Sequence, residues 1–121
     1  MPVNTYTKGK LAEDIAYKYL KQQGLKLLVK NYRSPMGEID LIMRDGEVTV
    51  FIEVRSRRHS RHMHAVESID SGKRTHIVNT SEEYLQNQRR SNKEICRFDV
   101  VVLTGAPDSA QIEWIKNAFE A

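Results

Sequence analysis

The sequence predicts a single α/β domain, a mixed β-sheet flanked by helices, and three observations support this. The chain has 121 residues, of which 40% are hydrophobic and 29% charged, as is usual for one globular domain. Apolar spacing alternates between helical and strand periods in the order α-β-β-β-α-β. A helical segment separates two apolar strand segments, which is typical of a crossover between parallel strands. We expect residues 1–121 to form one domain.

The first element is predicted to be a helix over residues 7–23, closed by a C-cap at Gly24. Apolar side chains recur at helical spacing along it, namely Leu11, Ala12, Ile15, Ala16, Tyr19 and Leu20. Residues 25–33 are then predicted to form a strand, and the sequence SPMG at 34–37 a turn.

The segment GEIDLIMRDGEVTVFIEVRSR, residues 37–57, is predicted to be a hairpin that turns at Asp45-Gly46. Strand alternation gives it one wholly apolar face, made of Ile39, Leu41, Met43, Val48, Val50, Ile52 and Val54. We expect this face to join the core. The same turn places Glu38 opposite Glu53, with Asp40 diagonal to Glu53.

The remaining hairpin face collects charged side chains. It carries Glu38, Asp40, Ile42 and Arg44 on one strand and Glu47, Thr49, Phe51, Glu53 and Arg55 on the other. Carboxylates placed this close repel one another, so sheet stability does not explain them. A divalent cation such as Mg²⁺, which binds one or two carboxylates, does explain them. The alternative is a surface network of salt bridges with Arg44, Arg55 and Arg57.

A basic loop follows the hairpin. The sequence RSRRHSRHMH, residues 55–64, contains four Arg, three His and no acid, in a chain of net charge +3 and pI about 9.1. Such a cluster attracts phosphates, although a solvated loop would look the same. Arg89, Arg90 and Lys93 form a second basic group. We do not expect His59, His62 and His64 to bind a transition metal, because no acid or cysteine completes a ligand set.

The second helix is predicted over residues 71–88, with Ile77, Val78, Ser81, Tyr84 and Leu85 facing inward. The nearly continuous apolar run at 97–104 predicts a strand covered on both faces, parallel to the strand at 47–55 through a right-handed crossover. The sequence IEWIKNAF is a short strand, or a strand that runs into a final helical turn.

Several single residues are expected to serve the fold. Asp99 lies inside an apolar strand and needs a partner, so we expect an ion pair with Arg57 or Arg97, with a role in a site as the alternative. Core packing is the expected role of Cys96, Trp114, Phe119, Tyr32 and Tyr84. The single cysteine excludes an internal disulfide and fits a reducing compartment. With no signal peptide and no membrane-spanning run, we expect a cytoplasmic protein without a membrane partner.

These motifs resemble known proteins. Asp40, a hairpin and then Glu53-Val54-Arg55 resemble the D…E-x-K signature of the restriction-endonuclease-like nuclease fold. The stretches GEIDLIMRDG, VFIEVRSRR, CRFDVVVLTG and EWIKNAF are similar to the bacterial YraN-type proteins. Those proteins are small, cytoplasmic and largely uncharacterised, and they are assigned to that fold and related to Holliday-junction resolvases. The resemblance covers residues 9–119.

The resemblance implies a metal site. In nucleases of this fold the hairpin Asp and Glu bind Mg²⁺ or Mn²⁺, which assigns these roles to Asp40 and Glu53. A Glu on the first helix often adds to the site, and here it would be Glu13, whose alternative is an ordinary helix-surface acid. Glu38 would hold the metal-binding residues in position without binding the metal itself, or it would be a solvated acid near the turn.

The sequence departs from the family pattern at Arg55, which stands where the signature has Lys. An Arg can hold a phosphate bidentately, but it cannot act as a neutral base. Lys73 is a candidate for a relocated lysine, although we favour an ordinary helix-surface role for it. The resemblance implies that Arg55 contacts the scissile phosphate. Contacts to the nucleic-acid backbone would come from Arg57, Arg58, Arg61 and Lys73.

Three functions follow from these residues. The first is a metal-dependent nuclease, or a nuclease-like protein, acting on DNA, with branched or damaged DNA among its candidate substrates. The second is a catalytically silent nucleic-acid-binding module in which Arg55 has replaced the signature Lys. The third is a protein-interaction module with a solvated acidic face. Cleavage of a symmetric junction would require two active sites and hence a homodimer.

Overall fold

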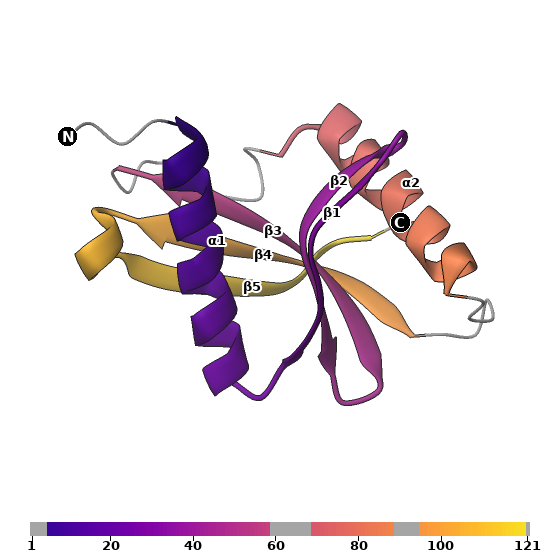
Figure 1. The fold of residues 1–121 in the computed structure, drawn as a ribbon, viewed down its shortest axis with the longest axis horizontal. Helices are drawn as coiled ribbons and strands as arrows, with labels where there is room; N and C mark the ends of the chain where they lie inside the picture. Colours follow the sequence, from indigo (N-terminus) through magenta and orange to yellow (C-terminus); the bar gives the residue numbers. More distant parts are fainter. Residues whose placement is uncertain (1–4, 59–68, 89–94, 121) are drawn as a thin grey trace.

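The computed structural model describes residues 5–58, 69–88 and 95–120, which form one five-stranded mixed sheet with a helix on each face (Figure 1). The elements in chain order are α1 (Thr5–Gln22), β1 (Lys26–Ser34), β2 (Gly37–Asp45), β3 (Val48–Arg57), α2 (Ser71–Asn87), β4 (Cys96–Thr104), η2 (Pro107–Ser109) and β5 (Gln111–Phe119). The predicted α/β class and element order are confirmed. The C-terminal segment is a strand throughout, so the order becomes α-β-β-β-α-β-β.

The strands lie side by side in chain order, β1-β2-β3-β4-β5. Neighbouring strands are antiparallel except β3 and β4, which are parallel because the chain crosses over between them through α2. The parallel pairing predicted for these two strands is therefore confirmed. Neither helix in the described ranges combines the length and apolarity needed to cross a bilayer.

Two apolar layers fill the space between the sheet and the helices. The layer under α1 contains Ala12, Ala16, Leu20, Leu25, Leu41, Met43, Val50, Ile52, Val101 and Leu103. The layer under α2 contains Ile39, Ile42, Phe51, Ile69, Ile77, Tyr84, Phe98, Val100, Val102 and Phe119. Each large side chain buried in this way contributes about 1.5–3 kcal/mol to folding. Tyr32 and Cys96 pack against the second layer and Trp114 against the first, in agreement with the predicted core roles.

The hairpin face that carries the acids is also a core face over much of its length. Ile42 and Phe51, which share it, are fully buried under α2. Only the opposite face was expected to be core, and this was incomplete because α2 covers the second face on its way from β3 to β4. Glu53 therefore continues a buried surface and is itself buried.

The register of the hairpin differs from the prediction by two residues. Asp45 pairs with Val48, so the turn residues are Gly46 and Glu47, not Asp45 and Gly46. Gly46 has a φ of +61°, and a two-residue turn with glycine first is the arrangement of a type II′ hairpin. Because the shift is an even number, each side chain keeps its face. Asp40, however, moves from a diagonal position to the level of Glu53.

Three smaller expectations were wrong. Ile39 packs under α2 although Leu41 packs under α1, so the alternation breaks between them. The break lies across from Asn31, which has a φ of +52° in β1. Leu11 is 40% exposed and lies at the border of the apolar stripe rather than within it, whereas Thr80, which periodicity missed, is buried on the inner side of α2.

Asp99 is fully buried and lies at the centre of a polar cluster on the α1 side of β4. Both of its carboxylate oxygens accept hydrogen bonds from Arg97 Nε, at 3.0 and 3.1 Å. Trp114 Nε1 and the backbone N–H of Asn117 donate two more, at 2.8 and 2.9 Å. Arg97 Nη2 continues to Asp45 at 2.9 Å. Asp99 is thus a structural residue, and its ion-pair partner is Arg97.

Candidate active site

Asp40 and Glu53 lie on the two central strands β2 and β3, one position beyond the last paired residues of that ladder. The backbone N–H of Val54 donates a hydrogen bond of 2.8 Å to Asp40 Oδ2. This bond holds the Asp40 carboxylate against β3, next to Glu53. Two acids separated by twelve residues in the sequence are therefore neighbours in the sheet.

Glu53 is buried, and no positive charge in the described residues lies close enough to form a short ion pair with it. Only 7% of the residue is exposed, and it faces the α2 side of the sheet. Arg55 Nε lies 3.5 Å and Lys73 Nζ 3.7 Å from Glu53 Oε1. Charge-assisted hydrogen bonds are nearer 2.7–2.9 Å, so neither cation is fully engaged. Within the described residues, the buried Arg55 Nε donates no hydrogen bond at all.

The electrostatics of the pair disfavour two negative charges. Burial raises the pKa of Glu53 to about 7, the nearby Asp40 carboxylate raises it as well, and Lys73 and Arg55 oppose the change. Burial also raises the pKa of Asp40, against the lowering effect of the Val54 hydrogen bond. Holding both carboxylates ionised at neutral pH therefore costs free energy, and a bound cation would offset that cost.

Glu13 reaches the same region from α1. Its side chain is half-buried, and burial raises its pKa, with a further increase from Asp40. A hydrogen bond from the Asn31 side chain acts in the opposite direction. Asn31 stands across from Asp40 in the β1–β2 ladder. The structure thus brings Glu13 within electrostatic range of Asp40, one member of the acid pair.

Lys73 is placed by the start of α2. Asp70 is the N-cap and accepts the Lys73 backbone N–H at 2.8 Å, which fixes the first helical turn. The Lys73 side chain then extends to Glu53. Periodicity did not indicate this contact, because it gives no information about which strand end the start of a helix will meet.

Glu38 lies at the margin of the site. Its side chain is 46% exposed and its Oε2 lies 3.4 Å from Arg33 Nε. It does not stand opposite Glu53, as the predicted register required. No three Asp, Glu, His or Cys side chains converge in the described part of the chain to form a ready-made metal site. Mg²⁺ does not need one, since it binds two carboxylates, waters and phosphate oxygens together.

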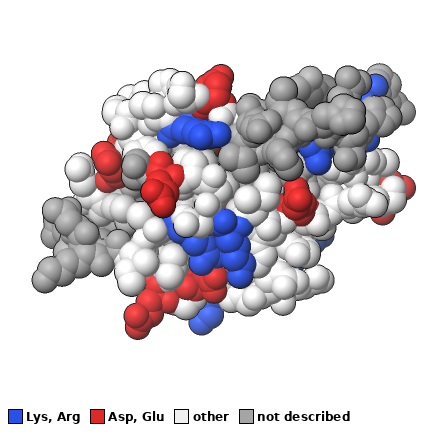
Figure 2. Space-filling model, turned by 180° about the vertical axis from the view of Figure 1, so that it is seen from behind, with Lys and Arg blue, Asp and Glu red and all other residues white. Residues whose placement is uncertain are grey.

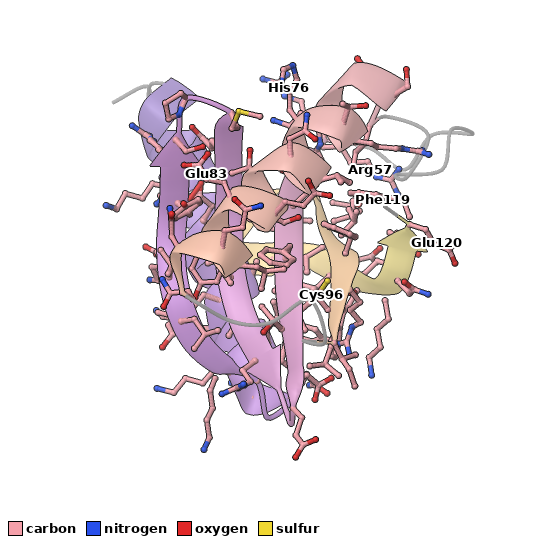
Figure 3. All side chains as sticks on the ribbon, turned by 90° about the vertical axis from the view of Figure 1, so that its right-hand side faces the viewer. Arg57, His76, Glu83, Cys96, Phe119 and Glu120 are labelled. Carbon is pink, nitrogen blue, oxygen red and sulfur yellow. The ribbon has the colours of Figure 1, made fainter. Side chains whose placement is uncertain are left out.

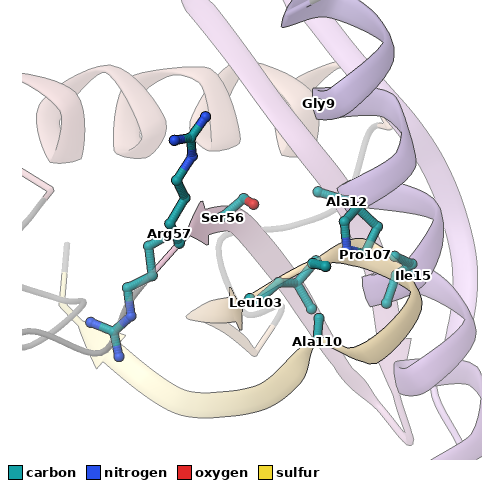
Figure 4. Close-up of a pocket in the computed structure, with 11 residues that line it drawn as sticks. Gly9, Ala12, Ile15, Ser56, Arg57, Leu103, Pro107 and Ala110 are labelled. Atoms are coloured by element: carbon teal, nitrogen blue, oxygen red, sulfur yellow. The ribbon is translucent and has the colours of Figure 1, made fainter. Parts of the chain in front are cut away.

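The predicted nucleic-acid contacts are only partly described. Arg57 ends β3 and Arg58 follows it, and both line a cavity of about 570 Å³ between α1 and the ends of β3 and β4 (Figure 4). Arg57 Nε donates to Thr104 Oγ1 at 3.1 Å. Arg61, the three loop histidines and the second basic group lie outside the described residues. The face shown in Figure 2 carries basic and acidic side chains close together.

A second hollow shares Lys73 with the surroundings of Glu53. It has a volume of about 330 Å³ and lies between the β1–β2 turn and α2, lined by Ser34, Pro35, Met36, Gly37, Glu38, Lys73, His76 and Ile77. His76, labelled in Figure 3 at the edge of the molecule, was missed by the sequence analysis. Its spacing of three residues from Lys73, one helical turn, was the available signal.

Comparisons with known proteins agree on one group of relatives. Residues 12–103 match the uncharacterised protein family UPF0102. A UPF0102 protein of Pseudomonas aeruginosa is 45% identical over 116 residues, covering 94% of this chain and 93% of the relative. A UPF0102 protein of Legionella pneumophila is 44% identical over 117 residues, covering 97% and 98%. The names of these relatives state no activity.

Proposed function

This chain belongs to the UPF0102 family, as its resemblance to the YraN-type proteins predicted, and we propose that it is a metal-dependent nuclease that hydrolyses phosphodiester bonds in DNA. The observation that carries the proposal is the burial of Glu53 beside a half-buried Asp40, with no cation of the described residues closer to Glu53 than 3.5 Å. Such an arrangement destabilises the fold unless a ligand uses it. The element order also suits the restriction-endonuclease-like fold that the hairpin motif resembles.

Each residue of the site has a role in this proposal. Asp40 and Glu53 would hold Mg²⁺ or Mn²⁺, and Glu13 would contribute from α1. The metal would supply an activated water and would neutralise charge on the phosphate. Arg55 would clamp the scissile phosphate with its guanidinium group, whose Nε has no hydrogen-bond acceptor in the described residues.

Lys73 would take the role of the signature lysine. Its Nζ reaches Glu53 Oε1 at 3.7 Å from a different element of the fold. The compact ammonium group of Lys73, with three rotatable donors, can position a water, whereas the planar guanidinium of Arg55 suits a phosphate. The two cations therefore divide the phosphate-binding and water-positioning roles.

A calorimetric titration with Mn²⁺ and Mg²⁺ tests the metal site. Wild type is compared with the Asp40→Asn, Glu53→Gln double variant. An Asp14→Asn, Glu82→Gln double variant, which removes the same charge from surface positions, is the control. We expect binding in wild type and control and none in the site variant. Absence of metal binding at millimolar concentration in wild type would overturn the proposal.

The same proteins are then assayed on linear, single-stranded and four-way-junction DNA. We expect metal-dependent cleavage by wild type and a loss of about 10²-fold or more in Lys73→Ala. Arg55→Lys should retain much of the activity, because its role is electrostatic. If Lys73→Ala cleaves as fast as wild type while Arg55→Lys gains activity, the signature role belongs to position 55 and our assignment of Lys73 is wrong.

The second candidate is a silent DNA-binding module, which the Arg at position 55 favours. It predicts binding that survives chelation with EDTA, falls steeply with salt, and leads to no cleavage with any metal. The third candidate, a protein-interaction module, predicts neither metal binding nor salt-dependent DNA binding. The titration and the cleavage assay together separate all three.

A further inference from the structure

The β1–β2 tip, defined as residues 34–37, carries exposed apolar side chains next to the acid pair. Pro35 is exposed, and Met36 is 44% exposed. In Figure 1 the tip extends to the N-terminal half of α2, the part of the helix that carries Lys73. We propose that this tip is a wedge that enters the base stack of DNA beside the scissile phosphate and so selects branched or locally unpaired DNA. The inference rests on the proposed function.

The tip is held rigidly, as a wedge must be. Gly37 has a φ of +148°, and a Cβ placed there would lie 2.8 Å from Thr80 Oγ1, so only glycine lets β2 approach α2 this closely. Ser34 Oγ accepts the backbone N–H of Met36 at 3.1 Å. His76 Nδ1 lies 3.3 Å from the Met36 carbonyl oxygen. The tip is thus preorganised on α2, and little ordering entropy is lost on contact.

The chemistry of the tip suits a base stack. Met and Pro are among the apolar side chains that proteins insert between base steps. Single exposed apolar residues are common, so exposure alone would mean little. Here the exposed residues occupy a rigid projection beside a site proposed to act on phosphodiesters, and that location distinguishes Met36 from Leu27, which is 37% exposed on the same strand pair.

The hollow of about 330 Å³ links the tip to Lys73, the lysine that lies 3.7 Å from Glu53. Met36 forms part of its wall and Lys73 another part, and Lys73 also contacts Glu53. His76, one turn further along α2, faces the same hollow. A DNA strand that ran along this hollow from a scissile phosphate at Glu53 would pass Lys73 before it reached Met36. Lys73 and His76 are placed to contact the intervening phosphate.

The substrate class follows from the cost of unstacking. Inserting a wedge into a continuous duplex breaks a stacked step, whereas at a branch or mismatch the stacking is already interrupted. A wedge beside the site therefore lowers the relative affinity for intact duplex. This gives a physical reason for preference among DNA structures without any reading of base sequence.

The test uses a four-way junction with 2-aminopurine at the branch point, a base whose fluorescence rises when it is unstacked. The full chain is added with Ca²⁺ in place of Mg²⁺, so that binding and unstacking are read without cleavage. We expect wild type to raise the fluorescence and to bind the junction roughly tenfold more tightly than linear duplex. Met36→Ala should lose both effects, while Met36→Leu should keep them.

Leu27→Ala is the matched control, because Leu27 has similar exposure at the other end of the same hairpin and should change neither signal. Junction binding without a fluorescence rise, or equal loss in Leu27→Ala and Met36→Ala, would overturn the wedge while leaving the nuclease proposal intact. Unstacking without cleavage in Mg²⁺ or Mn²⁺ would overturn the nuclease proposal and keep the wedge. Absence of DNA binding would overturn both.

Discussion

Glu53 and Asp99 are buried acids on neighbouring strands, and the protein treats them in opposite ways. Asp99, 1% exposed, accepts four hydrogen bonds at 2.8–3.1 Å, from Arg97, Trp114 and Asn117. Glu53, 7% exposed, has two cations at 3.5 and 3.7 Å and a second acid beside it. Asp99 faces the α1 side of the sheet and Glu53 the α2 side. The two faces of the same sheet thus hold one carboxylate that is fully hydrogen-bonded and one that lacks close partners among the described residues.

This difference gives a criterion that distinguishes buried charges that stabilise the fold from buried charges that are available to a ligand. A buried charge whose lone pairs are all bonded stabilises the arrangement that bonds them, and it has no capacity left for a ligand. A buried charge that lacks close partners costs stability, and it keeps coordination positions available. The Asp99 cluster ties β4 to β5 and to the end of β2, whereas Glu53 has no cation of the described residues closer than 3.5 Å.

The largest effect is expected from breaking the satisfied cluster. Asp99→Ala leaves the buried part of Arg97 and the Trp114 N–H without their acceptor, and should lower the free energy of unfolding by about 3–5 kcal/mol. Urea denaturation followed by circular dichroism measures it. A loss below about 1 kcal/mol would mean that the cluster is not structural and would remove the contrast with Glu53.

The second largest effect is expected when a divalent cation is added to the acid pair. A cation bound at Asp40 and Glu53 stabilises only the folded state, by about 3 kcal/mol at a hundredfold excess over its Kd. We expect Mn²⁺ to raise the thermal midpoint of wild type and of Asp14→Asn, and not that of Asp40→Asn, Glu53→Gln. An equal rise in all three proteins would show that the ion binds elsewhere.

A third effect depends on pH. The pKa of Glu53 is about 7 in the folded protein against 4.5 for the ordinary side chain, so between these values the folded state binds more protons than the unfolded state. Stability therefore falls as pH rises from about 4.5 to 7 and is level above that. Glu53→Gln removes this loss and should be more stable than wild type at pH 8 by about 1–3 kcal/mol, and similar to it below pH 4.5.

Denaturation of both proteins at several pH values measures this dependence, with Glu82→Gln, an exposed glutamate on α2, as the control. If Glu53→Gln is less stable than wild type at pH 8, Glu53 is a stabilising residue like Asp99 and the contrast fails. Saturating Mn²⁺ should also flatten the pH profile of wild type, because a metal ligand stays ionised.

The smallest effect is expected at an exposed ion pair. Lys30 Nζ lies 3.3 Å from Asp14 Oδ1, with both side chains about 40% exposed, and it also lies over the Tyr17 ring. Lys30→Met keeps the aliphatic contact and removes the charge, so it should change stability by less than about 0.5 kcal/mol. A larger loss by urea denaturation would show that exposed pairs matter here as much as buried ones.

Local pattern predicted much of this molecule. The α/β class, both helices, the parallel β3–β4 pair and the pairing of Asp99 with Arg97 were all expected and are observed. The two hairpin acids were singled out because alternation placed charges where sheet stability has no use for them. These features depend on the spacing of apolar and charged residues within one segment, or on the composition of one strongly apolar strand. Both can be read from the sequence alone.

The tertiary structure decided the rest. Whether Glu53 meets Glu38 or Asp40 depends on which two residues turn the hairpin, and only the structure shows that these are Gly46 and Glu47. The contact of Lys73 with Glu53, the burial of Ile42 and Phe51, and the approach of Gly37 to Thr80 all depend on where α2 lies against the sheet. The sequence by itself therefore determined which residues carry charge on which face, because side-chain direction follows backbone period. Which charges meet was left to packing between elements distant in the chain, because no local period encodes those distances.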